Sequence, residues 1–257
     1  MAFSVDWLAL REPADMAARD RDLLGQAATI AAGGLAVLDL GSGTGSTARA
    51  FDAAGAPDLK WRFVDNDPAL LKVARESFSD SAQILGDLGD IDALPLDGVG
   101  LVTASALLDL MPHHWLSALA HRLRAAHIPF YAALNYDGNL LWTPNHPQDA
   151  SITDAFNAHQ RGDKGLGRAL GPDSGVQAAA QFDALGFDVS LKNSPWRIGP
   201  GQAALHSALL DGIGAAAGEA GHRGVPEWTA ARHAGVHHSL CEVGHTDLLA
   251  IPPEYGS

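Results

Sequence analysis

The sequence predicts an α/β fold, with a mostly parallel β-sheet covered by helices on both faces. Short apolar runs alternate with helical stretches through residues 35–136, which is the order that parallel strands joined by crossover helices produce. The chain has 257 residues, of which 47% are hydrophobic and 18% are charged. This balance is enough to enclose the core of one large domain.

Each predicted element in the first half has its own signal. A helical pattern over 13–32 begins at a proline, which suits a first turn, and stops at two glycines. The apolar run 35–40 between glycines indicates a buried strand. The pattern then predicts strands at 61–64, 82–86, 99–104 and 128–134, and helices at 44–54, 68–78 and 112–126.

The alternation stops after residue 136. Residues 137–172 are rich in Asn, Pro, Gly, Asp and His, with a helical piece at 152–160. A connection of this length is usually functional or disordered, and we expect it to form a cap. Regular elements then resume, with helices at 173–185, 201–217 and 226–239 and strands at 187–191 and 246–251.

A glycine-rich turn is the most informative segment. The first predicted strand runs into Gly-Ser-Gly-Thr-Gly at 41–45, and a helix follows. Glycines let the backbone bend sharply and let a ligand approach it closely. The third glycine comes one residue too early for the dinucleotide fingerprint, and Asp39 stands two residues before the turn. A carboxylate there favours the ammonium group of an adenosylmethionine over a pyrophosphate.

Acidic residues follow the next two predicted strands. Asp65, with Asn66 beside it, lies about twenty residues beyond the turn, where a carboxylate accepts hydrogen bonds from ribose hydroxyls. Asp87 is placed to accept a hydrogen bond from an adenine amino group, and Leu88 to cover the ring face. Each aspartate alone equally well caps a helix, so the prediction rests on the ordered set.

With these motifs the chain resembles the class I S-adenosylmethionine-dependent methyltransferases. The resemblance rests on VLDLGSGTG at 37–45, FVDNDPALL at 63–71, GDLGD at 86–90 and LVTASALLDLMP at 101–112. It implies a Rossmann-like three-layer sandwich with helical cap insertions and a seven-stranded, mostly parallel sheet, whose last strand, 246–251, is antiparallel. It also implies an enzyme that uses S-adenosylmethionine and releases S-adenosylhomocysteine.

The resemblance implies how this cofactor is held. The glycine-rich turn would take the methionine part, the second strand end the ribose, and the third strand end the adenine. Family members often fold an N-terminal segment over the cofactor, so that Arg11 or Arg19 would meet the methionine carboxylate. The implied cofactor-binding residues are Asp39, Gly41, Ser42, Gly43, Gly45, Asp65, Asn66, Asp87, Leu88, Ala104 and Ser105.

On this basis we predict a single methyltransferase domain over residues 1–257. Residues 1–34 would form an N-terminal lid helix, 35–136 the cofactor-binding core and 137–172 a cap over the substrate. Residues 173–257 would complete the sheet and carry a helical insertion at 200–240.

The methyl acceptor should meet side chains at strand ends and in the cap. A hydroxyl or protonated amine must lose a proton, which requires a base, and we predict catalytic roles for Asp109, Tyr136 and His159. Family members often carry His where this sequence has Asp109. The predicted substrate-binding residues are Asn135, Trp142, His146, Asp163, Lys164, Trp196 and Arg197. The tryptophans equally well pack in the core, and the Asp163–Lys164 pair equally well lies on the surface.

A metal site was weighed and is not expected. His233, His237 and Cys241 are spaced four residues apart, so one helical face can carry all three. However, Gly235 weakens that helix, and zinc is normally bound by more than one element.

Composition restricts the partners. The formal net charge is −13, from 30 acidic and 17 basic side chains, and such a field repels phosphate backbones and anionic membranes. We therefore expect a small-molecule acceptor and neither nucleic acid nor membrane as a partner. The single cysteine suits a reducing cytoplasm, and we see neither a signal peptide at 1–30 nor an apolar run long enough to span a membrane.

Two other functions remain open from the sequence alone. The first is a nicotinamide-dependent oxidoreductase on the same fold, against which the glycine spacing and Asp39 argue. The second is a subunit that binds S-adenosylmethionine without catalysis. The clustered polar residues of 135–168 and 194–197 argue against this second function, although solvated loops also collect such residues.

Overall fold

The computed structural model describes residues 4–253 and 255. Its centre is one sheet with the order β3-β2-β1-β4-β5-β8-β6, and the short β7 also pairs with β8. β8 runs antiparallel to β5, β6 and β7, whereas the other pairs are parallel. The strands are β1 Ala36–Leu40, β2 Trp61–Asp65, β3 Ala82–Leu85, β4 Val99–Ser105, β5 Phe130–Thr143, β6 Asp188–Asn193, β7 Trp196–Ile198 and β8 Leu240–Ile251. The predicted seven-stranded arrangement with an antiparallel last strand is confirmed, and β7 is an additional short strand.

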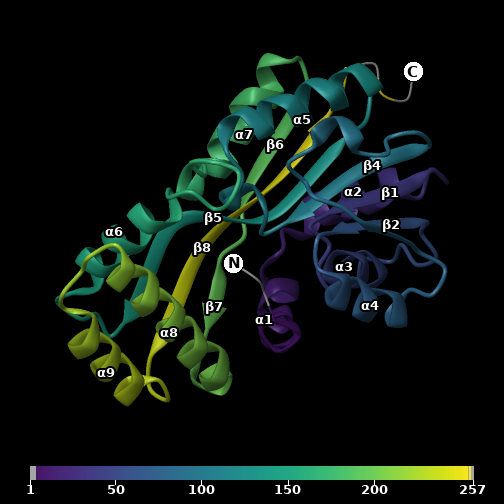
Figure 1. Cartoon of the computed structure of the whole chain (residues 1–257). Helices are drawn as coiled ribbons and strands as arrows, with labels where there is room; N and C mark the ends of the chain where they lie inside the picture. Colours follow the sequence, from purple (N-terminus) through teal and green to yellow (C-terminus); the bar gives the residue numbers. More distant parts are fainter. Residues whose placement is uncertain (1–3, 254, 256–257) are drawn as a thin grey trace.

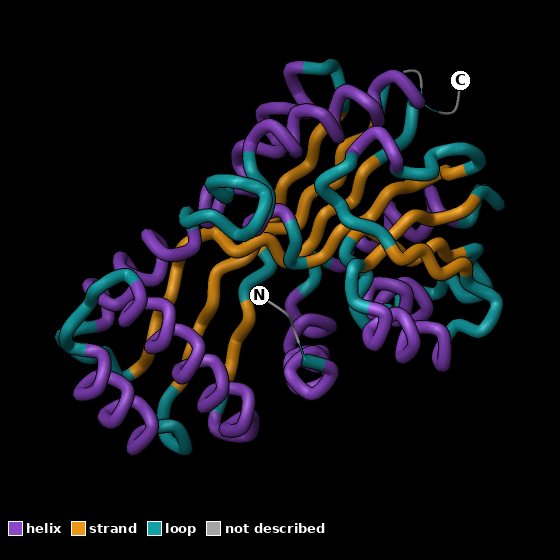
Figure 2. The backbone as a smooth tube through the Cα atoms, in the orientation of Figure 1, coloured by secondary structure: helices purple, strands orange, loops and turns teal. Residues whose placement is uncertain are grey.

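Helices cover both faces of this sheet (Figure 2). The helices are α1 Val5–Ala18, α2 Arg21–Ala31, α3 Ser46–Ala53, α4 Pro68–Ser77, α5 His113–Ala126, α6 Asp149–Gln160, α7 Ser174–Ala184, α8 Ala203–Glu219 and α9 Val225–Gly235. Short 3₁₀ helices lie at η1 Ile91–Ala93, η2 Leu108–Leu110, η3 Gly171–Asp173 and η4 Pro200–Gln202. Within the described residues, none of the helices has the length and hydropathy to cross a membrane.

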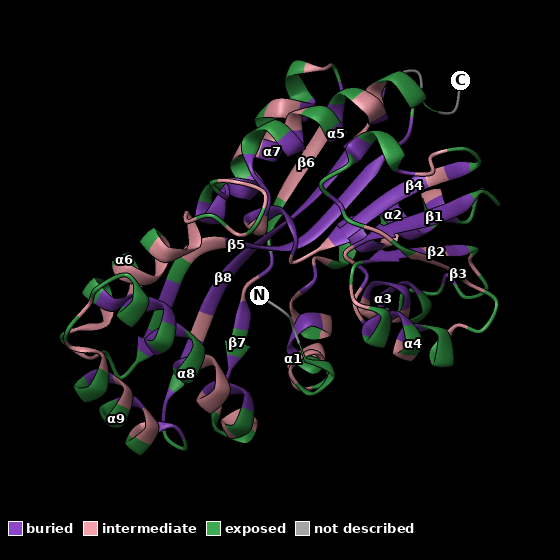
Figure 3. Cartoon of the chain, viewed as in Figure 1, coloured by how far each residue is buried: buried purple, intermediate pink, exposed green. Residues whose placement is uncertain are grey.

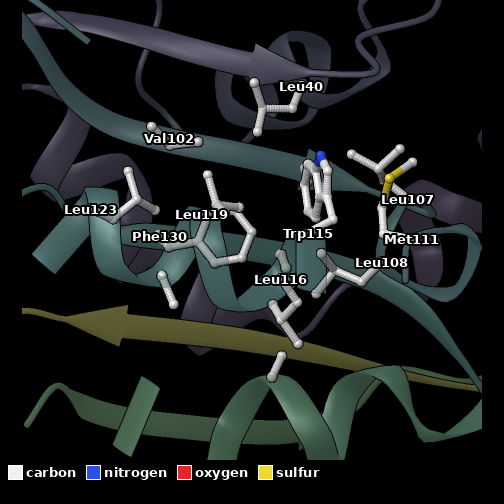
Figure 4. Packing of buried hydrophobic residues seen from close by; sticks show 14 of the residues in the cluster. Leu40, Val102, Leu107, Leu108, Met111, Trp115, Leu116, Leu119, Leu123 and Phe130 are labelled. Carbon is white, nitrogen blue, oxygen red and sulfur yellow. The ribbon is translucent and has the colours of Figure 1, made fainter. Parts of the chain in front are cut away.

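The central strands are buried on both faces, as Figure 3 shows. Successive side chains point to opposite faces of a strand, so Val37 packs with α2, α3 and α4, whereas Leu38 packs with α5 and α7. Figure 4 shows the second of these cores, where Leu119 of α5 lies near Val102 of β4 and Trp115 lies near Leu107. This explains why the strand segments are almost continuously apolar.

The N-terminal region forms two helices where the sequence pattern predicts one at 13–32. α1 begins after Ser4, whose hydroxyl accepts a hydrogen bond from Trp7 N at 3.1 Å. The chain then breaks at Arg19, and Asp20 caps α2 by accepting hydrogen bonds from Asp22 N and Leu23 N. The N-cap residue Asp20 marks the break between the two helices, which the helical periodicity alone does not show.

β5 and β8 are about twice as long as predicted, so the predicted cap begins with a strand. β5 crosses two register shifts against β8, between Ala132 and Asn135 and between Tyr136 and Leu140. Leu134 has φ 57° there, and its backbone N–H donates to Asp247 Oδ1 at 2.8 Å. Polar residues and Gly138 interrupt the apolar pattern at this bulge, which is why the strand was predicted to end at 134.

Beyond the bulge, β5, β7 and the first half of β8 form a distal lobe with α6, α8 and α9 (Figure 1). A third apolar core fills this lobe and includes Trp142, Ile152 and Trp228. Arg232 of α9 lies beside Asp149 of α6, with Nε to Oδ1 at 3.1 Å, and donates to the backbone O of Pro144 at 2.9 Å. The two long strands therefore join the Rossmann-like half to the distal lobe.

Candidate functional site

A cavity of about 530 Å³ opens at the C-terminal ends of β1, β2 and β4 and continues between α1 and the distal lobe. We refer to its first half, over the glycine-rich turn, as the turn half. We call the second half the chamber, and its polar and aromatic walls include Arg11, Asp109, Tyr136, Lys164, Trp196 and His245. In α/β folds, the C-terminal edge of the strands is where ligands bind.

The glycines of the turn have a backbone that other residues rarely adopt. Gly41 has φ 62° and Gly43 has φ 53°. A Cβ on Gly41 would stand 3.1 Å from Leu107 Cδ1, and one on Gly43 would stand 3.2 Å from Leu8 Cδ1. The backbone can therefore approach a ligand here, and α1 already lies against the turn.

Asp65 ties the turn to the second strand. Its carboxylate accepts hydrogen bonds from Gly43 N at 2.8 Å and from Asp67 N at 2.9 Å. The side chain lines the cavity although the residue is only 7% exposed. A carboxylate has about four acceptor sites, so Asp65 retains capacity for hydroxyl donors of a ligand.

Asp39 lies behind the turn and does not line the cavity. It is fully buried, and its Oδ1 accepts a hydrogen bond from Thr103 Oγ1 at 2.7 Å. Burial raises the pKa of Asp39 to about 7, against the lowering effect of hydrogen bonds from Thr103 and Thr47. A direct contact of Asp39 with the ligand is therefore not supported, whereas Thr47, next to it, does line the cavity.

Two further predicted cofactor residues lie outside the cavity lining. Gly45 begins α3 with φ 84° and backs onto Phe78. Ala104 is 1% exposed and packs in the core under α5, while Ala106, two residues later, reaches the cavity. The predicted residues that do line the turn half are Gly41, Ser42, Gly43, Asp65, Asn66, Asp87, Leu88 and Ser105.

Arg19, at the end of α1, lies behind the turn half and is linked to it through Ser105. Its Nη2 donates to Ser105 Oγ at 2.7 Å, and the residue is 3% exposed. Among the described residues, its Nε and Nη1 have no hydrogen-bond partner. A buried guanidinium with free donors favours a nearby anionic group.

Asp109 lies on η2, directly after β4, and lines the chamber. It is 8% exposed, and its Oδ1 has no hydrogen-bond partner within residues 4–253 and 255. Burial raises the pKa of Asp109 to about 6, which its own backbone N–H and the charges of Arg11 and Lys164 partly oppose. Such a group exchanges protons near neutral pH.

Tyr136 lines the chamber but is unsuited to be a base. Its hydroxyl donates to Asn157 Oδ1 at 2.8 Å. Burial, followed by the charges of Asp137 and Asp109, raises the pKa of Tyr136 well above its usual value. Its ring packs edge-on against Phe156, with centroids 5.5 Å apart, so Tyr136 forms an aromatic wall.

His159 lies at the outer side of the chamber and is not part of its lining. Its Nε2 lies 2.9 Å from Glu219 Oε2, and its Nδ1 lies 3.3 Å from Lys164 Nζ. Lys164 does line the chamber. The predicted catalytic role of His159 is therefore not supported by its position.

Strand geometry explains why Asn135 and Arg197 do not reach the chamber. Asn135 is fully buried and donates from Nδ2 to Thr246 O at 3.0 Å, while its neighbour Tyr136 faces the cavity. Trp196 likewise faces the cavity, and Arg197 points to solvent and pairs with Glu242 at 3.3 Å. Adjacent residues of a strand point to opposite faces.

Three cap residues are also placed elsewhere. Trp142 packs in the distal core, with its ring centroid 5.4 Å from that of Trp228. His146 belongs to the turn before α6, where its backbone N–H donates to Asp149 Oδ2 at 2.7 Å. Asp163 is exposed and accepts hydrogen bonds from Gly165 N and Gly167 N. These residues shape the cap and do not line the cavity.

The N-terminal helix supplies walls of the cavity, of which the sequence analysis named only Arg11. Trp7, Leu8, Arg11 and Asp15 of α1 all line the cavity. Arg11 pairs with Asp15 at 2.9 Å and lies 5.0 Å above the Trp196 ring, whose Nε1 donates to Asp15 Oδ1 at 3.0 Å. The Ser-x-x-Trp segment at 4–7 indicates where α1 begins, because Ser is a preferred N-cap residue.

His245 also lines the chamber, and the sequence analysis did not predict it. It is the cross-strand partner of Tyr136, and its ring lies 5.1 Å from that of Trp196. Burial, followed by the charge of Arg11, lowers the pKa of His245 to about 3. The imidazole is therefore neutral at physiological pH. The strand was predicted to begin one residue later, at 246, which left His245 outside it.

The three residues weighed for a metal do not converge. α9 ends at Gly235, so His237 and Cys241 are not on its face. His233 pairs with Asp211 at 2.8 Å, and Cys241 is buried in β8. Over the described part of the chain, no group of three His, Cys, Asp or Glu residues is arranged to hold a metal ion.

Comparison with known proteins adds a family and a fold. A family described as a methyltransferase domain matches residues 37–127, from β1 to the end of α5. YcgJ from Bacillus subtilis has a similar fold, with a TM-score of 0.51 and 16% identity over 91% of this chain and 99% of that chain. The cyclopropane synthase MmaA2 from Mycobacterium tuberculosis has a TM-score of 0.51 and 14% identity over 96% of this chain and 94% of that chain. At these identities the likeness concerns the fold alone. No curated protein sequence matches the chain.

Proposed function

We propose that this chain, which matches a methyltransferase domain over residues 37–127, is a class I S-adenosylmethionine-dependent methyltransferase and transfers a methyl group to a small molecule held in the chamber. This match supports an enzyme with S-adenosylmethionine as its cofactor over the nicotinamide-dependent alternative. One observation carries the rest of the proposal. A single cavity joins the glycine-rich turn to an enclosed chamber, so a cofactor and an acceptor can meet in it.

The residues of the turn half fit S-adenosylmethionine. The positive φ values of Gly41 and Gly43 keep the space that a Cβ would fill. Asp65 has acceptor sites left for ribose hydroxyls, and Asp87 with Leu88 would hold the adenine. Ser105, which lines the turn half, would receive the methionine carboxylate, and the positive charge of Arg19 directly behind it would favour this anion.

When bound, the cofactor would supply a methyl group already activated by its sulfonium, in an in-line displacement. The protein's own contribution is then mainly to position the acceptor, to exclude water and to receive a proton. α1 closes over the turn through Leu8, and the guanidinium of Arg49 on α3 pairs with Glu12 of α1 at 2.5 and 2.8 Å. This contact would keep the reacting groups away from solvent.

Asp109 is the residue best placed to receive the acceptor's proton. It lies at the end of β4, between the turn half and the chamber, and carries a carboxylate oxygen without a hydrogen-bond partner in the described structure. A pKa of about 6 leaves it ionised at neutral pH while it remains basic enough to accept a proton. Tyr136 and Trp196 would form the aromatic walls that orient the acceptor.

The enclosure of the chamber favours a small molecule as the acceptor. α1, α6, α8 and the segment 161–170 surround it, and cavities of this size suit small ligands. The net charge of −13 disfavours a nucleic acid. A reducing cytoplasm is the compartment that suits Cys241, the one cysteine of the sequence.

The proposal is tested by measuring S-adenosylhomocysteine formation with two fractions of a cell extract. One contains metabolites below about 1 kDa and the other contains proteins and nucleic acids, since a cavity of this size admits only small ligands. We expect product with the small-molecule fraction only, and at least about a hundredfold lower rate for Asp109→Asn, the lower end of the usual effect of losing a general base. Product formed only with the macromolecular fraction would contradict the small-molecule assignment.

A further inference from the structure

Resting on the proposed function, we infer that the methyl acceptor is an amine, which enters as an ammonium ion, pairs with the carboxylate of Asp109 and loses its proton there. To the proposed class of reaction, methyl transfer, this adds a class of substrate. It follows from the charges of the chamber, taken group by group.

Asp109 is a buried carboxylate without a full set of partners. The residue is 8% exposed and lines the cavity, and its Oδ1 accepts no hydrogen bond from the residues the structure describes. Burying an ionised carboxylate is costly unless it is paired and hydrogen-bonded. A ligand that brings a positive charge and N–H donors to this carboxylate supplies both.

The cationic side chains of the chamber already have partners. Arg11 makes a two-pronged pair with Asp15, from Nε at 2.9 Å and from Nη2 at 3.0 Å. Lys164 directs its Nζ to His159 Nδ1 at 3.3 Å, and the other ring nitrogen of His159 lies 2.9 Å from Glu219 Oε2. Both charges act on Asp109 and partly oppose the rise of its pKa, but each is shared with a second carboxylate, that of Asp15 for Arg11 and that of Glu219 for Lys164.

The other groups around Asp109 add no further compensating charge. His245, on β8, is neutral because burial lowers its pKa to about 3. Tyr136, on β5, keeps its proton because burial raises its pKa. On η3, which packs against η2, Asp173 pairs with Arg161 at 3.1 Å. Asp87, at the border of the turn half, adds a second acidic side chain. Over the lining of the whole cavity, negative charge is therefore in excess, with Asp15, Asp65, Asp67, Asp87 and Asp109 against Arg11 and Lys164.

Aromatic rings complete a surface suited to a cation. Trp196 already carries the Arg11 guanidinium over its ring at 5.0 Å, and Tyr136 and Phe156 form an edge-to-face pair nearby. Aromatic faces attract cations, and a net charge of −13 draws cationic molecules toward the protein. An alcohol would leave the charge of Asp109 unbalanced, and a carboxylic acid would add to it.

Proton transfer converts the ammonium ion and the carboxylate into a neutral amine and a carboxylic acid. One N–H bond of the ammonium breaks and its proton bonds to a carboxylate oxygen of Asp109, which becomes a carboxylic acid. The electron pair of the broken bond stays on nitrogen, which becomes a neutral amine with a lone pair. Asp109 later returns the proton to solvent. Only the neutral amine is a nucleophile, so recognition and activation take place at the same carboxylate.

Binding to the protein loaded with S-adenosylhomocysteine tests the inference without relying on activity. The probes are three matched sets, with phenyl, indolyl and naphthyl skeletons, each ending in an ethylamine, an ethanol or an acetate. We expect the amine of at least one set to bind at least about tenfold more tightly than its alcohol and its acid, equivalent to about 1.4 kcal/mol. Equal binding of the three head groups, or no binding of any amine, would overturn the inference.

Asp109→Asn is the decisive variant, because it keeps the shape and removes the charge. We expect it to abolish the preference for the amine while S-adenosylhomocysteine and the alcohol bind as before. Asp183→Asn, on the exposed side of α7, is the matched control and should keep the preference. Amine affinity should also fall as the pH drops through about 6, where Asp109 becomes protonated.

A measurement on the unsubstituted protein guards against a variant that does not fold. The ¹³C resonance of the Asp109 carboxyl reports its titration, and amine binding should move its midpoint to lower pH, because an adjacent cation favours the carboxylate. An unchanged midpoint at saturating amine would overturn the inference. If S-adenosylhomocysteine itself did not bind, the proposed function would fail instead, so the two failures are distinguishable.

Discussion

Three aspartates at strand ends show how one residue type takes different roles in different surroundings. Asp65 keeps hydrogen bonds from two backbone N–H groups and holds the turn. Asp39 is sealed behind it, where burial raises its pKa to about 7. Asp109 lines the chamber, and its buried Oδ1 lacks a partner in the described part of the chain. Whether an aspartate stabilises the turn or takes part in the reaction therefore depends on its position relative to the cavity and not on its residue type.

The buried Asp39 predicts a pH-dependent gain in stability from Asp39→Asn. The folded protein holds a proton on Asp39 up to about pH 7, whereas the unfolded chain releases it near 3.8. The wild type therefore loses stability as pH rises between these values, by up to about 4 kcal/mol. Urea unfolding should show the variant gaining on the wild type across this window and no further above it. A difference that is the same at pH 4.5 and pH 8 would contradict the assignment.

For Asp65→Asn we expect a loss of both cofactor affinity and stability. An amide has one acceptor oxygen, so it cannot serve both Gly43 N and Asp67 N, and its NH₂ would face one of these donors. The affinity for S-adenosylhomocysteine should fall at least about tenfold, and the free energy of unfolding by about 1–3 kcal/mol. Titration calorimetry and urea unfolding measure the two effects. Asp90→Asn, which replaces the cap residue of η1 with an equally good one, should change neither.

The sequence predicts the position of a site residue correctly where that residue ends a strand, and wrongly where the strand continues beyond its predicted end. Asp65 and Asp87 follow short apolar runs, so their place at the sheet edge was predictable. Asn135 and Trp142 were assigned to the substrate because β5 was expected to end at 134. Their actual surroundings depend on side-chain alternation along β5 and on contacts with α9, which the local pattern does not contain.

Among the elements, α1 connects the two halves of the site. Glu12 pairs with Arg49 on α3, and Arg11 and Asp15 contact Trp196 on β7. α1 therefore lies across the cavity with one contact on each side. A cofactor enclosed beneath it would leave only as fast as these contacts open.

Glu12→Gln should weaken one side of α1 and speed cofactor release. The Glu12–Arg49 pair is partly exposed, with side chains 21% and 29% accessible, so we expect only about a threefold rise in the dissociation rate. Stopped-flow displacement of S-adenosylhomocysteine measures this rate. Asp6→Asn, on the exposed surface of the same helix, is the control. A release rate as slow in Glu12→Gln as in this control would argue against α1 as the covering element.

Local signals predicted most elements, and cooperative contacts account for the rest. The strands β1, β2, β3 and β4 and the helices α4 and α5 lie within two residues of their predicted bounds, because glycines and prolines mark their ends. The extended parts of β5 and β8 are stabilised by pairing with each other. A polar segment such as 135–139 forms a strand only with its partner beside it.

On the scale of the whole molecule, β5 and β8 pass without interruption from the Rossmann-like half into the distal lobe (Figure 1). The two halves therefore share hydrogen-bonded strands instead of a flexible linker. We expect them to unfold together, as a single domain does.

Scanning calorimetry with Asp149→Ala tests this cooperativity. The substitution removes the partner of Arg232, which is 6% exposed, and breaking such a buried pair costs about 3–5 kcal/mol. We expect a single transition, shifted as a whole to lower temperature. Two resolved peaks, of which only one moves, would show that the lobes unfold separately.

The account depends most on the turn half as the place where S-adenosylmethionine binds. Titration calorimetry of the full chain with S-adenosylhomocysteine, and separately with a nicotinamide dinucleotide, tests this directly. The account predicts a saturable heat for one S-adenosylhomocysteine per chain and none for the dinucleotide. No heat with S-adenosylhomocysteine, or equal binding of both ligands, would contradict it.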